Sequence, residues 1–163
     1  MKKCDIHDAI TEALLKRFKT AEFAASQAHQ AATNKESVAE NKYDTFGLEA
    51  SYLAHGQSQR VVECEQDWLL FSKKAPSQYQ VGDAATLWCA VELTPVDSPT
   101  PSRKYFFISP CAGGLVVEVQ EQAVYVITAS SPVGKAIIGK TTEEEVHLSQ
   151  NGVQVVYEIT SIQ

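Results

Sequence analysis

The sequence lacks the segments that mark membrane-spanning and secreted proteins. No run of apolar residues approaches the length needed to cross a bilayer. The start, Met1-Lys2-Lys3, is followed by Asp5, Asp8 and Glu12, which interrupt the apolar stretch that a signal peptide requires. We therefore expect a cytoplasmic protein with no membrane partner.

Recognisable catalytic and metal-binding spacings are also missing. The cysteines (Cys4, Cys64, Cys89, Cys111) form no Cys-x-x-Cys pair, and the histidines show no ligand spacing. Gly113-Gly114 lacks the spacing of a phosphate-binding loop, and no Gly-x-Ser-x-Gly element occurs. The cysteines are predicted to be free thiols, and the chain is predicted to have no catalytic site of its own and no stably bound cofactor.

Positive charge is scarce relative to negative charge. The 163 residues include 20 acidic and 14 basic side chains, a formal net charge of -6, so a broad electrostatic grip on nucleic acid is disfavoured. Independent DNA binding is therefore not expected. The apolar fraction of 44% is typical of a soluble globular protein, and the length allows a small domain plus an extended helical element.

The first part of the chain is predicted to be a helical hairpin. Between Ile6 and about Thr33 there is no proline or glycine, and apolar residues recur at steps of four and three: Leu14, Phe18, Ala21, Ala25, Ala28, Ala32. This heptad-like seam ends in alanines, so a partner helix could approach closely there. A second proline-free stretch, with looser periodicity, runs from Ser37 to about Ser72. Helices joined by few residues fold back most simply as an antiparallel pair.

The rest of the chain is predicted to be a small, mostly antiparallel β-sheet with one short helix. Apolar and other residues alternate from Ala85 to Leu93, and further strands are expected at 105–108, 115–119, 124–128, 145–149 and 153–162. Ser131 is a candidate N-cap, Pro132 suits the first helical position, and Gly139 suits the helix end. The predicted α+β chain therefore divides into a coiled-coil hairpin at 1–74 with its tip near 34–41, a linker at 75–80 and a β domain at 81–163.

Three stretches resemble the Gre transcript-cleavage and elongation factors. Residues 130–140 (SSPVGKAIIGK) are similar to the family's Ser-Pro-x-x-x-Ala-x-x-Gly-Lys stretch. Glu145-Val146 with Tyr157-Glu158-Ile159 resembles the final hairpin, and residues 37–41 (SVAEN) resemble the Asp-Leu-Ser-Glu-Asn tip of the family's coiled coil. The resemblance implies an FKBP-like second domain that docks on RNA polymerase, with Ser131, Pro132 and Lys135 as docking candidates.

The resemblance also implies how the tip would act. In cleavage-stimulating members the coiled coil enters the secondary channel of RNA polymerase, and tip carboxylates help to hold a second Mg²⁺ shared with the polymerase active site. The nascent RNA 3′ end is then an indirect partner. Here Glu40 is the candidate metal-assisting residue, only within the polymerase complex, with Glu36 and Asp44 as possible helpers.

The tip departs from the family pattern at one position. Family members carry an Asp and a Glu three residues apart, and this chain has Ser37 and Glu40. Ser-x-x-Glu is also a capping box, so Ser37, Glu40 and the adjacent Asn41 can start a helix without any metal. Two interpretations follow: a factor that stimulates cleavage, and a non-cleaving relative that occupies the channel and inhibits or competes.

A third interpretation is a peptide-binding or prolyl-isomerase module whose coiled coil only dimerises it. Its ligand pocket would be built from aromatic side chains, although core packing is the simpler explanation for them. The candidates are Trp88, Tyr105, Phe106, Phe107, Tyr125 and Tyr157.

Overall fold

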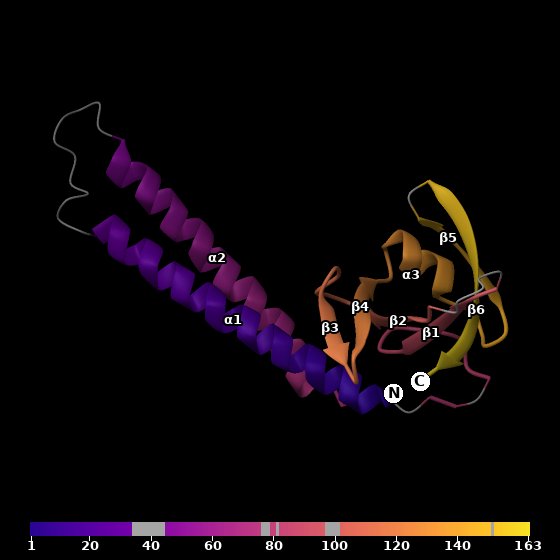
Figure 1. Cartoon of the computed structure of the whole chain (residues 1–163). Helices are drawn as coiled ribbons and strands as arrows, with labels where there is room; N and C mark the ends of the chain where they lie inside the picture. Colours follow the sequence, from indigo (N-terminus) through magenta and orange to yellow (C-terminus); the bar gives the residue numbers. More distant parts are fainter. Residues whose placement is uncertain (34–44, 76–78, 81, 97–101, 151) are drawn as a thin grey trace. The chain divides into compact units, whose positions relative to one another are not determined.

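The computed structural model describes residues 1–33, 45–75, 79–80, 82–96, 102–150 and 152–163. The order of elements is α1 (Lys3–Thr33), α2 (Phe46–Lys73), β1 (Ala90–Pro95), β2 (Lys104–Ser109), β3 (Val116–Val119), β4 (Gln122–Thr128), α3 (Pro132–Ile137), β5 (Glu145–Gln150) and β6 (Val153–Ile162). The predicted α+β class is confirmed, with long helices first and a β-sheet carrying one short helix after them (Figure 1).

The chain divides into two compact units, and the first residues belong to the β unit. One unit contains Met1–Ile10 together with Ala75–Gln163, and the other contains Thr11–Lys74. The predicted division after residue 74 did not include the contribution of residues 1–10 to the β unit. Nothing local in the sequence signals it, because the helical pattern of α1 continues without a break through this point.

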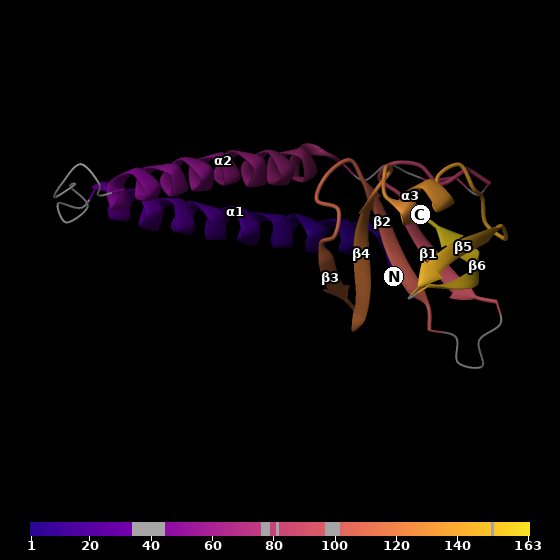
Figure 2. The same cartoon turned by 90° about the horizontal axis from the view of Figure 1, so that it is seen from above.

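The helical unit is an antiparallel pair, with α1 and α2 side by side in both views (Figures 1 and 2). On α1 the predicted seam is confirmed, since Leu14, Ala21 and Ala28 are buried. On α2 the seam follows the same alternation of four and three, through Ala50, Ala54, Gln57, Val61, Cys64, Trp68 and Phe71. The rings of Phe18 and Trp68 stack across the pair, 5.8 Å apart and nearly parallel at 9°.

The second helix starts later than predicted. Thr45 is its N-cap residue and Phe46 is its first helical residue. The prediction of one continuous helix from Ser37 is therefore wrong at Thr45, which is not helical. The Thr45 carbonyl accepts the Glu49 N–H at 2.9 Å, and its hydroxyl donates to the Glu49 carboxylate at 2.9 Å without capping a backbone N–H.

The β unit is built on a six-stranded sheet of order β3-β4-β2-β1-β6-β5. All neighbours are antiparallel except β2 and β4, which are parallel. Alternation along β2 assigns its side chains to the two faces. Phe106 and Ile108 join the core cluster that includes Ile137 of α3. Phe107 lies on the other face, where its ring meets Trp88 edge-on.

The segment before β1 is not the strand that the alternation predicted. Strand pairing begins only at Ala90, and Trp88 has a left-handed backbone conformation with φ of 71°. The backbone of Ala85 instead bonds to the chain after α3, accepting from the Gly139 N–H and donating to the Lys140 carbonyl. Ala85 and Cys89 are buried, but Leu87 between them is 42% exposed, so the burial pattern of this loop departs from the period of two that its sequence shows.

The predicted helix signals after β4 are confirmed. Ser131 is the N-cap of α3, Pro132 is its first residue, and Gly139 adopts a φ of 83° just beyond its end. The predicted β5–β6 hairpin is also confirmed, with Gly152 at a φ of 80° in its turn.

Burial of His7 makes the stability of the β unit dependent on pH. Burial lowers the pKa of the His7 imidazole, Asp8 partly offsets this by attraction, and Lys3 adds a small lowering effect. As the pH drops below the ordinary histidine pKa, the His7 imidazole takes up a proton in the unfolded chain before it does so in the folded chain. The contribution of His7 to the free energy of unfolding is therefore greatest above the ordinary histidine pKa and is lost as the pH falls below it.

We predict that the free energy of unfolding falls more steeply in the wild type than in His7→Leu between about pH 7.5 and pH 5.5. Urea unfolding at several pH values measures the slopes. His147→Gln, which changes an exposed histidine, is the matched control and should keep the wild-type slope. Equal slopes for wild type and His7→Leu would contradict the prediction.

Candidate functional site

The predicted tip residues lie outside the described part of the structure. Glu36, Ser37, Glu40, Asn41 and Asp44 all fall within 34–44. The described helices end on either side of them, α1 at Thr33 and α2 at Phe46. Their roles as metal-assisting or capping residues stay predictions.

The predicted docking residues lie together at α3: Ser131 is its N-cap, and Pro132 and Lys135 are within it. Ser131 has a structural role. Its hydroxyl donates to the Thr128 carbonyl at 2.7 Å and accepts the Gly134 N–H at 3.0 Å. The hydroxyl is therefore engaged within the fold, so Ser131 can contribute to docking mainly by fixing the start of α3.

Two glycines, Gly134 of α3 and Gly113 of the segment between β2 and β3, allow close packing against Thr128. A Cβ atom on Gly134 would lie 2.1 Å from the Thr128 carbonyl oxygen, and one on Gly113 would lie 2.8 Å from the Thr128 Cγ2. The first distance involves backbone on both sides, so no side-chain movement can relieve it. Gly134 is thus required for the position of α3, and the sequence pattern around Ser131 did not reveal this.

Pro132 and Lys135 are exposed and form the outward surface of the short helix. Lysine and arginine are scarce in residues 75–163, where they occur only as Arg103, Lys104, Lys135 and Lys140. Arg103 pairs with Glu92 at 3.2 Å, Lys140 pairs with Glu144 at 3.7 Å, and Lys104 lies over the Tyr157 ring at 5.4 Å. Within the described residues no such partner is assigned to Lys135, whose ammonium can therefore meet an external carboxylate.

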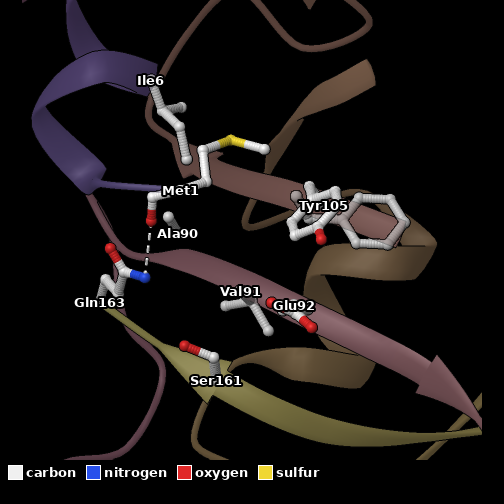
Figure 3. Close-up of a pocket in the computed structure, with 9 residues that line it drawn as sticks. Met1, Ile6, Ala90, Val91, Glu92, Tyr105, Ser161 and Gln163 are labelled. Atoms are coloured by element: carbon white, nitrogen blue, oxygen red, sulfur yellow. Dashed lines mark hydrogen bonds between the residues drawn. The ribbon is translucent and has the colours of Figure 1, made fainter. Parts of the chain in front are cut away.

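The aromatic side chains considered as a ligand pocket are engaged in packing. Phe106, Phe107 and Tyr157 are buried, and Tyr125 lies against Phe106 with ring centroids 5.8 Å apart. The nearby cavity, between the start of α1 and strands β1 and β2, holds about 20 Å³ (Figure 3). Ligand pockets in proteins are typically hundreds of Å³, so this cavity is too small for a peptide.

The described residues contain no group of three or more His, Cys, Asp or Glu side chains arranged to hold a metal ion. All four cysteines are free thiols, with Cys64 and Cys89 buried. Among the helices that the structure describes, none is both long and apolar enough to cross a membrane.

Comparison with solved structures finds proteins of the Gre type. Gfh1 of Thermus thermophilus, described as a GreA factor homolog, is 18% identical, with 94% of each chain covered and a TM-score of 0.40. Gfh1 of Thermus aquaticus is 16% identical over 93% of this chain and 92% of that one, with a TM-score of 0.40. A GreA/GreB elongation factor from Nitrosomonas europaea is 14% identical over 71% of this chain and 91% of that one, with a TM-score of 0.35.

These likenesses concern a Gre-like fold alone, because the identities are low. No protein-family model matches the chain, and no curated protein matches it.

We predict that Ser131→Ala lowers the free energy of unfolding by about 1 kcal/mol, because the N-cap bond to Gly134 is lost. Gly134→Ala should cost more, roughly 1–3 kcal/mol or above, because its methyl group overlaps the Thr128 carbonyl. Denaturant unfolding measures both changes. Ser130→Ala removes an exposed hydroxyl next door and should stay within about 0.5 kcal/mol of wild type. A Gly134→Ala protein as stable as wild type would contradict this account of the packing.

Proposed function

We propose that this chain is a transcription elongation factor that binds RNA polymerase, inserting its helical pair into the secondary channel while α3 docks the β unit on the channel rim. The sequence resemblance at residues 37–41, at 130–140 and in the final hairpin motivates the proposal. The described structure supports it through the surface of the helical pair and the exposure of Pro132 and Lys135.

The observation that carries the proposal is the exposure of large apolar side chains along both long helices. Phe23 of α1 is 67% exposed and Tyr52 of α2 is 69% exposed. Leu48, Leu53 and Val62 are also exposed on α2. Apolar side chains gathered on one element favour contact with another macromolecule, and insertion into a protein channel would cover them from several sides.

The length and thickness of the helical pair fit the same role. The 28 residues of α2 span about 42 Å at 1.5 Å per residue. Alanines occupy the seam of both helices towards the connection, at Ala28 and Ala32 on α1 and at Ala50 and Ala54 on α2. Small seam residues permit close approach, which favours a pair that is thinnest at the end predicted to enter the channel.

At the tip, Glu40 would supply a carboxylate oxygen to a Mg²⁺ shared with the polymerase, assisted by Glu36 or Asp44. Oxygen ligands suit this hard cation, and a pair of metal ions can activate water and stabilise the leaving oxygen during phosphodiester hydrolysis. The factor would then be an accessory protein. The polymerase would hydrolyse its own backtracked transcript.

A second candidate function is channel occupancy without cleavage. Ser37 stands where the resembled family has an aspartate, which leaves Glu40 without its usual acidic partner. A single carboxylate holds a second Mg²⁺ less well than two do, because each anionic oxygen ligand adds to the attraction. The chain would then inhibit elongation or compete with cleaving factors.

We predict that, if the chain stimulates cleavage, Glu40→Ala abolishes the release of short 3′ fragments from backtracked complexes and leaves polymerase affinity nearly unchanged. Ser37→Asp should increase fragment release by restoring the paired carboxylates. Glu22→Ala, at an exposed acidic position on α1, is the control and should behave as wild type. Equal cleavage by wild type and Glu40→Ala would reject the metal-assisting role. Absence of cleavage by the wild type, with binding retained, would select the non-cleaving alternative.

We predict that Lys135→Gln weakens binding to RNA polymerase by roughly three- to ten-fold, with a smaller salt dependence, because an unpaired surface cation is lost from the docking helix. Competition binding at two ionic strengths measures both effects. Lys140→Gln removes the same charge from a residue paired with Glu144, so it should change affinity little. Equal losses from both variants would argue for a general charge effect and against docking through α3.

A further inference from the structure

The first helical residue of α1 is bonded to a side chain far away in sequence. The N-terminal N–H groups of a helix have no partner within the helix, and Ser, Thr, Asp or Asn at the N-cap normally satisfies one of them. Met1 and Lys2 carry no such group. Instead, the Lys3 N–H donates to the Gln163 Oε1 at 3.0 Å.

The other end of the same carboxamide is also engaged. The Gln163 Nε2 donates to the Met1 carbonyl at 3.0 Å, as the dashed line in Figure 3 marks. One donor and one acceptor of a single amide group therefore hold the chain on both sides of the helix start. This pairing sets the orientation of the carboxamide, because a flip would place two donors or two acceptors together.

The residue that carries this group is itself held by the sheet. Gln163 follows β6, its N–H donates to the Ala90 carbonyl at 2.9 Å, and its carbonyl accepts the Ala90 N–H at 3.0 Å. Ala90 begins β1, which is paired on both sides, to β2 and β6. The carboxamide is thus presented from a fixed backbone position.

The residues after the helix start are buried on the same unit. Ile6 and Ile10 are buried, and the His7 ring lies 6.4 Å from the Trp88 ring. The turn between β3 and β4 adds a further polar contact, from the Gln120 Nε2 to the Asp5 Oδ2 at 3.3 Å. The small cavity of Figure 3 lies beside these contacts and is lined by Met1, Ile6 and Gln163 among others.

We propose that Gln163 is a helix cap supplied from the sheet, a positioning residue that fixes the start of α1 on the β unit. The helix gains its cap only when β6 is paired with β1, which couples formation of the first turn of α1 to formation of the sheet. The coupling acts on the first turn of α1, a helix that continues unbroken to Thr33. The inference rests on contacts within one unit and holds whether or not the chain binds RNA polymerase.

The test compares Gln163→Ala, Gln163→Met and Gln163→Glu in the full chain, by NMR amide hydrogen exchange at residues 3–10. Loss of a cap worth about 1 kcal/mol should speed exchange at the start of α1 about five-fold in the Ala and Met variants, with strand amides unchanged. Glu keeps an acceptor for the Lys3 N–H and places negative charge at a helix N-terminus, but it cannot donate to the Met1 carbonyl, so it should restore only part of the protection lost in the Ala and Met variants.

Gln154→Ala, at an exposed glutamine on β6, is the matched control and should exchange as wild type. Wild-type protection in Gln163→Met would overturn the proposal, because methionine fills the space without making either bond. Exchange accelerated equally in the strands would also overturn it, since Gln163 would then support the sheet generally. If Gln163→Ala fails to fold, Gln163→Met decides, because it keeps the side-chain volume: wild-type exchange rates at residues 3–10 in that variant reject the cap.

Discussion

A pair of antiparallel helices can bury only the side chains along one seam, and this limit governs the helical part of the molecule. The seam positions advance by alternating steps of four and three residues on both helices, from Leu14 on α1 and from Ala50 on α2. Within residues 11–33 and 47–73, the buried side chains all lie on this seam: Leu14, Ala21, Ala28, Cys64 and Phe71. Large apolar residues outside the seam, such as Phe23 and Tyr52, contribute little to the stability of the isolated pair. Under the proposed function, contact with RNA polymerase would account for them.

Seam composition then divides the pair into two regions. Near the ends that join the β unit in sequence, the seam contains Leu14, the stacked rings of Phe18 and Trp68, and the buried Phe71. Towards the connection, alanines replace them and the apolar area buried per turn falls. Within the described helices, stability should therefore decline from the end with the large seam residues towards the end with the alanines. The decline follows from the change in seam residues from large apolar side chains to alanine.

The sequence predicts local features of the fold well and long-range features poorly. Periodicity identified the α1 seam, and turn chemistry identified the Ser131 cap, Pro132 and the left-handed Gly139, because each depends on neighbouring residues. The strand assigned from Ala85 was wrong, since only tertiary hydrogen bonds to Gly139 and Lys140 separate a packed loop from a strand. Of the candidate site, Pro132 and Lys135 are exposed as docking requires, whereas Ser131 is engaged internally.

The contacts at the N-terminal end of α1 could not have been predicted from one sequence. Gln163 and Lys3 are separated by nearly the whole chain, and a glutamine after the last strand carries no local signal of a capping role. The same holds for Gly134, whose need to be glycine depends on where the Thr128 carbonyl lies. Sequence patterns locate helices and strands because these depend on neighbouring residues. The same patterns miss residues such as Gln163 and Gly134, whose roles depend on which groups the fold brings next to them.

Docking and tip chemistry are physically separable in the proposed function. Affinity would arise from α3 and from the apolar surface of the helical pair, and neither depends on the residue at position 37. A change from an acidic residue to serine at the tip would leave binding intact while weakening metal binding, since the hydroxyl can still cap a helix but brings no negative charge. Under the proposed function, one substitution would therefore change a factor that assists hydrolysis into one that obstructs the channel. The identity of residue 37, more than the fold, would then distinguish the two outcomes.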